Sequence, residues 1–440
     1  MNAPTDVVQD RRLTVQSISR IEGEARLRVV VRGDQIVETR LSIFEAPRFF
    51  ERLVVGRNPN EVIDIVARIC GICPVAYQIT AAMAFERLFG VELDPSVRQL
   101  RRLMYWGEWI QSHALHIYFL AAPDFLGYPD VLAMTRDHRP DVARAVALKH
   151  AGVAILDLLG GRSVHPVSLR VGGFSRTPTR GEMAGLRPLI EQCLQDALTT
   201  VDVVSGFELP EFEREPLLLS LRAEDGYALD EGRIVTSEGL DLSPADWETA
   251  FEEEQHEDSN ALYARGRDGR HHLLGPSARL TLAGDQLHPL AAAALTKSGG
   301  IGQIRRNVFA SSAGRAVELV HAAAEALAII DAYEPPDSPS VPSTPRAGRA
   351  AWSTEAPRGL LFHRYDLDED GRVLAATIVP PTSQNQASIE DDLRAYLPSV
   401  LGLPDAAATA RLEALIRCYD PCISCATHFL ELDVQRELPG

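Results

Sequence analysis

The chain has 440 residues, of which 45% are hydrophobic and 24% charged, and its 61 acidic and 44 basic side chains give a formal net charge of −17. This composition is typical of a globular protein with a sizeable core, and the negative charge argues against binding to nucleic acid or to an anionic membrane surface. No apolar run approaches the ~18 residues of a membrane span, and the first residues do not resemble a signal peptide. We therefore expect a cytoplasmic protein, or one that is exported only alongside a partner.

A β-hairpin is expected near the N-terminus. Apolar side chains occupy every second position over much of residues 25–31, which is the period of a half-buried strand. Residues 32–34 (Arg-Gly-Asp) are a turn signal, and residues 36–43 can return as the second strand. This hairpin predicts a β-rich start to the chain.

Helical patterns dominate after the hairpin. Asn58 and Glu61 have the spacing of a capping box, and Pro59 suits the first helical position. A second helix can begin at Pro74 and end at Gly90. The fold class is therefore predicted to be α+β and predominantly helical. Further helices are expected over residues 97–121, 142–159, 181–204 and 314–332.

Two segments depart from the helical pattern. Residues 252–258 are a run of charged and polar side chains within an acidic segment at 242–260, and they favour a solvated helix face or a loop. Residues 333–357 contain six prolines and favour an extended surface connector. We expect a single domain. Its parts would be a β-rich part at 1–58, a helical core at 59–332, this connector, and a C-terminal part at 358–428.

Four of the six cysteines form two Cys-x-x-Cys pairs, at Cys70 with Cys73 and at Cys422 with Cys425. Six cysteines are too few for a disulfide scaffold, but four thiolates on two such turns make a soft, closed metal site. Structural zinc is the common occupant of such a set, and a redox disulfide is a weaker alternative. The roughly 350 residues between the pairs count against zinc, because structural zinc sites join short segments with little core.

The surroundings of the two pairs resemble the signature motifs of the nickel–iron hydrogenase large subunit. The first is Arg-Ile-Cys-Gly-Ile-Cys at residues 68–73, and the second is Asp-Pro-Cys-Ile-Ser-Cys-Ala-Thr-His at 420–428. With the four further motifs given below, six occur in the family's order, and they identify the chain as a member. The family's fold implies a long-helix core and an N-terminal β-sheet region. The further motifs lie at residues 19–23, 47–51, 165–173 and 355–359.

The resemblance implies a nickel–iron centre. By position, Cys70 and Cys422 would be terminal nickel ligands, and Cys73 and Cys425 would bridge nickel to an iron that carries cyanide and carbon monoxide in this family. Thr382 would donate a hydrogen bond to a cyanide. Four thiolate charges exceed the charge of Ni²⁺, so a buried site also needs nearby donors or cations.

The resemblance also assigns roles in the reversible cleavage of H₂ into protons and electrons. Arg358 would lie over the open face of the metals, where its permanently charged guanidinium offers five donors. Cys422 would take a proton, and Glu22 would relay it, because a relay needs a carboxylate within hydrogen-bond reach. Glu51 and His428 would bind a structural Mg²⁺, a hard cation that suits the carboxylate.

Two positions differ from the best-known, membrane-linked members of the family. Tyr77 stands where they carry histidine, and Ser112 stands where they carry aspartate. His113 and His116 share one helix face near Ser112, either as core residues or as part of the active-site surroundings. With the neighbouring motifs, these differences resemble the soluble, multimeric, bidirectional branch, which includes sulfhydrogenases and passes electrons to NAD(P) or another soluble carrier.

No iron–sulfur cluster or nucleotide site is expected in this chain. Once the four ligands are assigned, only Cys193 and Cys418 remain, too few for a four-cysteine cluster, and both are expected to be buried as small hydrophobic side chains. Gly172 and Gly173 do not form a dinucleotide-binding loop. Electrons would therefore leave through a small iron–sulfur subunit, with NAD(P), flavin and more clusters on further subunits.

Maturation is also implied by the resemblance. In this family an endopeptidase removes a C-terminal extension after the position of His428 once nickel is in place, and the twelve residues at 429–440 would be that extension. Nickel-insertion proteins are implied partners. Three alternatives stay open: a non-catalytic relative of the same fold, a hydrogen sensor, and a zinc-stapled scaffold. The four cysteines with Arg358 argue against the first, the extension argues against the second, and the third predicts zinc without nickel.

Overall fold

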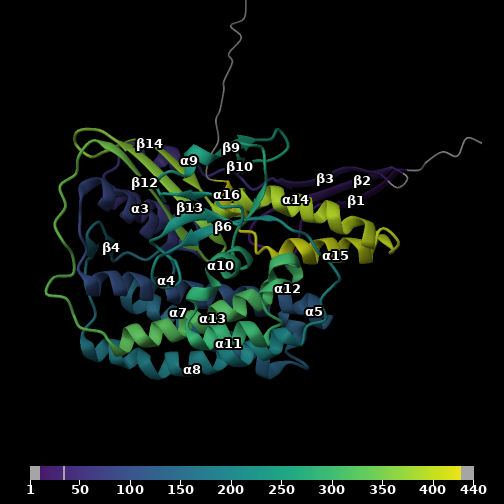
Figure 1. Ribbon diagram of the computed structural model, residues 1–440, viewed down its shortest axis with the longest axis horizontal. Helices are drawn as coiled ribbons and strands as arrows, with labels where there is room; N and C mark the ends of the chain where they lie inside the picture. Colours follow the sequence, from purple (N-terminus) through teal and green to yellow (C-terminus); the bar gives the residue numbers. More distant parts are fainter. Residues whose placement is uncertain (1–9, 33–34, 428–440) are drawn as a thin grey trace, which may run out of the picture.

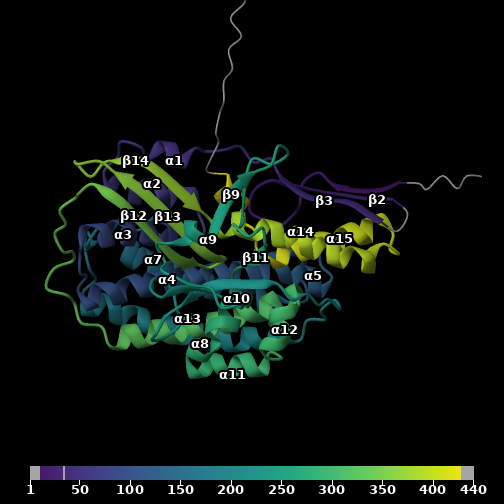
Figure 2. The ribbon, with the colours of Figure 1, turned by 45° about the horizontal axis from the view of Figure 1, so that its top comes forward.

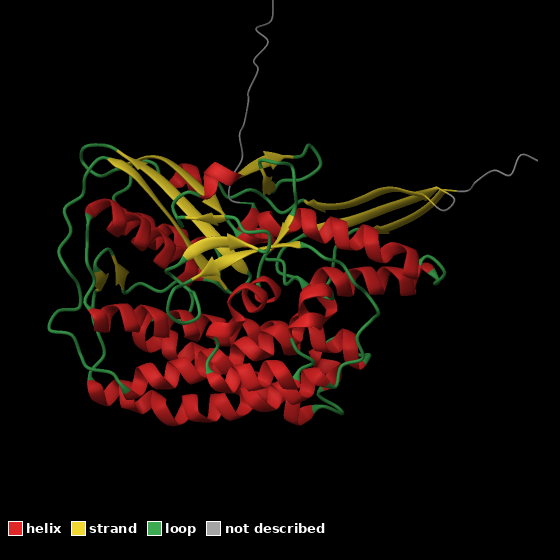
Figure 3. Ribbon diagram, viewed as in Figure 1, coloured by secondary structure: helices red, strands yellow, loops and turns green. Residues whose placement is uncertain are grey.

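Long helices form the core of the computed structural model, which describes residues 10–32 and 35–427. The longest are α4 (Pro95–Leu115), α7 (Arg139–Gly160), α8 (Arg180–Ser205) and α13 (Ser311–Asp331). They form the lower layer of Figure 1, where α4 packs on α7 and α13, and α8 packs on α13. Strands gather in the layer above them (Figure 3). The structure is α+β and predominantly helical, as predicted.

The predicted helix boundaries agree with the structure except at one place. The predicted helix over residues 97–121 ends at Leu115, and the chain continues as a π-helix at His116–Ala121. The other three long helices begin and end within three residues of the prediction. A π-helical segment inserts extra backbone into a helix and is frequent at functional sites, and apolar periodicity alone does not distinguish it from the preceding α-helix.

The first cysteine pair lies in a loop between two helices with well-defined ends. Helix α2 (Pro59–Val66) has the predicted capping box, with Glu61 N donating to Asn58 Oδ1 (3.1 Å) and Asn58 N donating to Glu61 Oε2 (3.0 Å). Helix α3 (Pro74–Phe89) ends at Gly90, whose φ of 69° is left-handed. Between them, a short 3-10 turn at Ala67–Ile69 leads into the cysteine loop.

The N-terminal sheet is antiparallel, in the order β1-β2-β3. It comprises β1 (Asp10–Val15), β2 (Ala25–Arg32) and β3 (Gln35–Ile43), so the predicted hairpin is confirmed and one strand precedes it. Its apolar face shares a core with α14 (Pro381–Val400) and α15 (Asp405–Cys418). Figure 2 shows this sheet lying beside both helices.

A second antiparallel sheet carries the Arg358 turn. Strands β12 (Gly348–Ala356), β13 (Gly359–Leu367) and β14 (Val373–Val379) lie in that order, and α3 packs on β12 and β13. The turn between β12 and β13 consists of Pro357 and Arg358. The prediction of an extended connector over residues 333–357 is therefore wrong at its C-terminal end, because residues from Gly348 onward pair as a strand.

Smaller sheets cover the region between these layers. A four-stranded sheet has the order β11-β6-β7-β8, with β6 (Leu217–Arg222), β7 (Arg233–Thr236), β8 (Asp241–Leu242) and β11 (His272–Leu273). The charge run forms strand β9 (Phe251–Gln255), which pairs with β10 (Leu262–Gly266). The expectation of a helix face or a loop is wrong there, because cross-strand pairing of Glu252 and Glu254 with Arg265 compensates their charge.

None of the helices in the described part of the chain has the length and apolar character needed to span a membrane. The remaining helices and strands are short. These short elements are α1 (Phe50–Leu53), α5 (Ala122–Leu126), α6 (Val131–Met134), α9 (Trp247–Ala250), α10 (Pro276–Ala283), α11 (Pro289–Lys297), α12 (Ile301–Arg306), α16 (Ile423–Ala426), β4 (Leu169–Arg170) and β5 (Gly173–Phe174).

Candidate metal centre

The two cysteine pairs meet in one buried cluster. The sulfurs of Cys70, Cys73, Cys422 and Cys425 all lie within 4.8 Å of one another, and each residue is at most 4% exposed. Cys70 Sγ is 3.5 Å from Cys422 Sγ, and Cys73 Sγ is 3.9 Å from Cys425 Sγ. Each pair therefore contributes one sulfur to each of these contacts. The arrangement offers four soft ligands to a common centre.

Burial makes it electrostatically unfavourable for all four cysteines to be thiolates without a nearby cation. Loss of water, together with the neighbouring sulfurs, raises the pKa of Cys422 well above its usual value, and burial also raises that of Cys425. Four thiolates in one dry pocket need compensating positive charge. A bound soft cation would supply it, so the donor set fits a metal centre.

Tight backbone contacts hold the second pair in place. Residue Glu22 forms a parallel bridge with Cys422, and Ile423 N donates to Glu22 O (2.9 Å). Gly23 has a φ of 87°, and a side chain there would come within 2.7 Å of Ile423 Cβ. Glycine is therefore required at this position. The N-terminal motif thus positions a ligand almost four hundred residues away in the sequence.

Arg358 lies beside the second cysteine pair, and its place over the open face of the metals stays a prediction. Its Nε donates to Asp420 O (2.7 Å) and its Nη2 donates to Asp420 Oδ1 (3.1 Å). Burial lowers the pKa of the guanidinium. The negative charges of Asp420 and of the nearby cysteines, Cys422 first among them, outweigh that effect and raise the pKa of Arg358 well above its usual value. Its Nη1 is buried and has no hydrogen-bond partner among the described residues. The two N–H groups of Nη1 are thus available to a ligand.

Glu22 accepts two hydrogen bonds from Ser424, which lies between Cys422 and Cys425. Ser424 N donates to Glu22 Oε2 (3.0 Å), and Ser424 Oγ donates to Glu22 Oε1. The side chain is half-buried. The structure therefore brings this carboxylate to the C-terminal pair while leaving it partly open to solvent, a geometry compatible with proton relay.

Thr382 also contacts the cluster. Cys422 N donates to Thr382 Oγ1 (3.0 Å), and the side chain is 4% exposed. The hydroxyl accepts in this contact, so its own hydrogen is still able to donate elsewhere. The predicted hydrogen bond to a cyanide stays a prediction.

Glu51 lies near other carboxyl groups. Ile378 N donates to Glu51 Oε1 (2.7 Å). Burial, followed by repulsion from Glu51 and Glu248, raises the pKa of Glu253 well above its usual value. Carboxyl groups that crowd together in this way are suitable ligands for a hard cation. His428, the other predicted magnesium ligand, lies outside the described residues, as does the predicted extension at 429–440.

The two residues that differ from the membrane-linked pattern are both buried. The hydroxyl groups of Tyr77 and Ser112 have no hydrogen-bond partner in the described part of the chain. Burial, followed by the charges of the four cysteines, raises the pKa of Tyr77 well above its usual value. His113 and His116 instead bind within the core, through Glu318 Oε2 (2.9 Å) and Arg417 O (2.8 Å).

Glu108 is a residue of this region that sequence reasoning missed. It is fully buried on α4, and it accepts hydrogen bonds from Val75 N (2.6 Å) and Ala76 N (3.2 Å) at the start of α3. It therefore holds the first turn after Cys73. A glutamate in the middle of an apolar helix was the available signal, but its partner lies on another helix.

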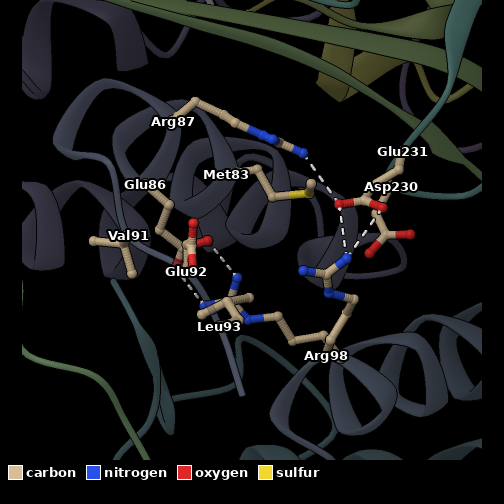
Figure 4. Close-up of a pocket in the computed structure, with 10 residues that line it drawn as sticks. Met83, Glu86, Arg87, Val91, Glu92, Leu93, Arg98, Asp230 and Glu231 are labelled. Atoms are coloured by element: carbon tan, nitrogen blue, oxygen red, sulfur yellow. Dashed lines mark hydrogen bonds and ion pairs between the residues drawn. The ribbon is translucent and has the colours of Figure 1, made fainter. Parts of the chain in front are cut away.

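A surface cavity beside α3 and α4 is unrelated to the cysteines (Figure 4). Its arginines pair with acidic neighbours: Arg87 and Arg98 both contact Glu231 (3.1 and 3.3 Å), and Arg101 makes a bidentate pair with Glu86 (2.7 and 2.6 Å). The arginines of this cavity are therefore compensated by acidic partners. The cysteine cluster, in contrast, requires an added cation.

Comparisons with known proteins agree with the geometry. The family model described as nickel-dependent hydrogenase matches residues 48–153 and 285–428. Sulfhydrogenase 2 subunit alpha of Pyrococcus furiosus is 30% identical over 426 residues, which cover 96% of this chain and 100% of that protein. NAD-reducing hydrogenase HoxS subunit beta of Cupriavidus necator is 27% identical, over 96% of this chain and 95% of that protein.

Solved structures share the fold. The crystal structure of an NAD⁺-reducing [NiFe]-hydrogenase in the H₂-reduced state superposes with a TM-score of 0.85 at 26% identity, covering 95% of this chain and 99% of that chain. A [NiFeSe]-hydrogenase of Dm. baculatum superposes with a TM-score of 0.77 at 22% identity, covering 96% and 100%. The second likeness concerns the fold alone.

Proposed function

The chain belongs to the nickel-dependent hydrogenase family, as a catalytic large subunit that cleaves H₂ reversibly, and from this premise we propose how its residues divide the reaction. Cys70, Cys73, Cys422 and Cys425 would hold a nickel–iron centre, with Cys73 and Cys425 shared between the two metals. One observation carries this assignment: four buried sulfurs from the two ends of the chain lie within 4.8 Å of one another.

The centre, when bound, would supply the cleavage of H₂, which overall yields two protons and two electrons. Cys422 Sγ would accept the proton, and the Glu22 carboxylate would carry it outward. Support comes from the hydrogen bonds that fix Glu22 on the backbone and side chain of Ser424, two residues after Cys422. A half-buried carboxylate can exchange protons with solvent on its outer side.

Arg358 would orient and polarise the substrate over the cluster. Asp420 fixes the guanidinium through Nε and Nη2, which leaves Nη1 available. Preorganised donors of this kind act strongly in a buried, water-poor site. Thr382 would donate a hydrogen bond to a cyanide of the iron, which would also carry carbon monoxide.

A structural Mg²⁺ would bind at Glu51 and His428. The support is that Glu51 lies close enough to Glu253 to repel its charge, and that Glu253 Oε1 is buried without a hydrogen-bond partner among the described residues. A divalent cation would relieve this repulsion.

Electrons would leave through a small iron–sulfur subunit. The relatives are named as single subunits of hydrogenases, and the other two cysteines, Cys193 and Cys418, are buried apart from the cluster. Exposed apolar residues Val164 and Val167 (53% and 46%) flank Pro166, whose carbonyl accepts a hydrogen bond from Gln78 Nε2 (2.8 Å) in the helix that follows Cys73. We propose this surface as the docking site, since short distances favour electron transfer.

The electron acceptor would be NAD(P) or a related soluble carrier. Relatives of comparable length include an NAD-reducing hydrogenase, sulfhydrogenases and F420-non-reducing hydrogenases. NAD(P), flavin and further clusters would bind on other subunits. A maturation endopeptidase would remove residues 429–440 after nickel-insertion proteins had acted, and the complex would work in the cytoplasm.

Metal analysis of the native complex tests this proposal. Protein purified with its partners from a nickel-supplied host should contain nickel and iron near one each, with infrared bands from iron-bound cyanide and carbon monoxide. Hydrogen-dependent dye reduction, followed by assays with NAD⁺ and NADP⁺, should identify the acceptor. Zinc without those bands, in protein matured under competent conditions, would refute the assignment.

A further inference from the structure

A second buried charged cluster lies next to the turn that carries Arg358, and the proposed reaction does not use it. Its centre is Arg279 on α10, which is 1% exposed, and its acidic members are Glu318 on α13 and Glu355 on β12, which are both fully buried. Buried charges are costly unless they are paired and hydrogen-bonded. The position of this cluster therefore calls for an explanation.

Arg279 uses all five of its N–H donors. Nε and Nη2 donate to the two carboxylate oxygens of Glu318 (both 2.8 Å), and Nη1 donates to Glu355 Oε2 (2.9 Å). The two remaining donors bind main-chain carbonyls, Nη1 at Ala356 O (3.0 Å) and Nη2 at Pro357 O (2.8 Å). Those two carbonyls belong to the residues immediately before Arg358.

The guanidinium of Arg279 is itself fixed from several sides. Tyr227 Oη donates to Glu318 Oε1 (2.8 Å), and His113 Nε2 donates to Glu318 Oε2 (2.9 Å). The ring of Trp109 lies 4.2 Å below the guanidinium carbon. A planar fork that is held in this way can define the position of the backbone it binds.

The start of α10 also touches the turn directly. Gly275 has a φ of 97°, and a Cβ there would lie 3.0 Å from Arg358 O. Gly275 thus packs against the carbonyl of Arg358, and Arg279 binds the carbonyls of the two residues before it. Little freedom remains for the Arg358 backbone.

We propose that Arg279 is a positioning residue for Arg358: by binding the carbonyls of Ala356 and Pro357, it holds the Arg358 guanidinium against Asp420 and over the cysteine cluster. Glu318 and Glu355 hold Arg279 in turn. The inference rests on the proposed function of Arg358, and Arg279 itself need not touch substrate. Lysine cannot replace the fork, because one ammonium cannot serve two carboxylates and two carbonyls at these separations.

The test compares Arg279→Lys with Arg358→Lys, singly and together, in the native complex. The matched control is Arg101→Lys, which alters another buried arginine with a bidentate carboxylate partner (Glu86) and a carbonyl partner (Arg170 O, 2.9 Å). We expect Arg279→Lys to lower kcat per nickel roughly 10- to 100-fold, because small misplacement of a reacting group costs about that much. Arg101→Lys should leave kcat per nickel unchanged.

Coupling separates a positioning role from a general structural one. If Arg279 acts through Arg358, the double variant should be no slower than Arg358→Lys by more than about 3-fold, because interacting residues are not additive. Independent, multiplicative losses would overturn the proposal, as would full activity of Arg279→Lys. The infrared bands of the bound diatomic ligands should shift in Arg279→Lys and not in Arg101→Lys.

Crystallography of Arg279→Lys provides a readout that needs neither nickel nor activity. The expected result is a displaced turn at residues 356–358 and loss of at least one Arg358–Asp420 hydrogen bond. An unchanged Arg358 would overturn the inference even if the variant purified without metal. Absence of hydrogenase activity in the wild-type complex would instead refute the proposed function, so the two failures are distinguishable.

Discussion

Two buried arginines near the same β-turn differ in how completely they are bound. Arg279 has an acceptor for each of its five N–H groups, whereas Arg358 leaves Nη1 without a partner among the described residues. Both guanidinium groups are almost inaccessible to water. Since a buried unsatisfied donor is costly, the vacancy at Arg358 indicates a role that only a ligand completes, and saturation at Arg279 indicates a role in holding structure.

The cysteine cluster should show the largest effect. Cys422→Ser replaces a soft ligand with a hard, poorly ionised one, so we expect loss of nickel and loss of all hydrogen-dependent dye reduction. Metal analysis and activity assays on the same preparation measure both. Cys193→Ser, which alters a buried cysteine outside the cluster, is the control and should retain nickel. Full activity of Cys422→Ser would contradict the ligand assignment.

Arg358→Lys tests whether the free donor of Arg358 acts in the reaction. Removal of a preorganised donor in a buried site lowers turnover by about 10²- to 10³-fold, and we expect that loss with nickel and iron retained. Steady-state H₂ oxidation, normalised to nickel, measures it. Turnover equal to the wild type would show that the free Nη1 donor has no role in the reaction.

Glu22→Gln should interrupt proton transfer while sparing the metals. General acid–base steps contribute about 10²- to 10⁴-fold, so a loss near 10²-fold is expected in H₂ oxidation and in H/D exchange. Gln keeps an acceptor for Ser424 but cannot carry the proton. Glu24→Gln alters an exposed neighbour and serves as the control. An unchanged exchange rate in Glu22→Gln would exclude it from the path.

The buried cluster of Arg279, Glu318 and Glu355 should affect how the stability of the protein changes at acid pH. Burial opposes the charge of Glu318, but Arg279 and His113 lower its pKa to about 2, from 4.5 in an unfolded chain. The stabilisation is therefore complete above pH 4.5 and is lost as the pH falls toward 2, by about 2 kcal/mol between pH 5 and pH 3. The free energy of unfolding, measured with urea, should fall more steeply over this pH range in the wild type than in Glu318→Gln. Parallel pH dependences of the two proteins would disprove this role of Glu318.

The surface cavity of Figure 4 should give the smallest effect. Arg87 is about half-exposed in its pair with Glu231, and exposed pairs contribute about 1 kcal/mol or less. Arg87→Ala should shift the unfolding midpoint slightly and leave turnover per nickel unchanged. A large loss of activity would mean that this cavity takes part in function after all.

Local signals in the sequence predicted much of this structure. The capping box at Asn58, the stop at Gly90 and the alternation over residues 25–31 act between near neighbours, and each appears in the structure. The cysteine motifs likewise predicted which sulfurs would meet. Local physics and short motifs were sufficient for these features.

Long-range partners were not predictable in this way. His113 contacts Glu318 across 205 residues, and neither local sequence implies the other. The charge run at 252–258 was expected to be solvated because charge is usually exposed, yet Glu253 is half-buried in strand β9 and its Oε1 atom is inaccessible to water. Arg279 had no motif around it, and its role follows only from the carbonyls that folding brings to it.

The separation of the two cysteine pairs has a consequence for biosynthesis. About 350 residues lie between Cys73 and Cys422, and ribosomes add roughly 5–20 residues per second. The first pair therefore waits on the order of 20–70 s before its partners leave the ribosome. During that interval the nascent chain presents only two of the four thiols of the cluster, a half-site that can be oxidised or can capture the wrong ion. Correct assembly of this centre is thus a matter of timing as well as of geometry.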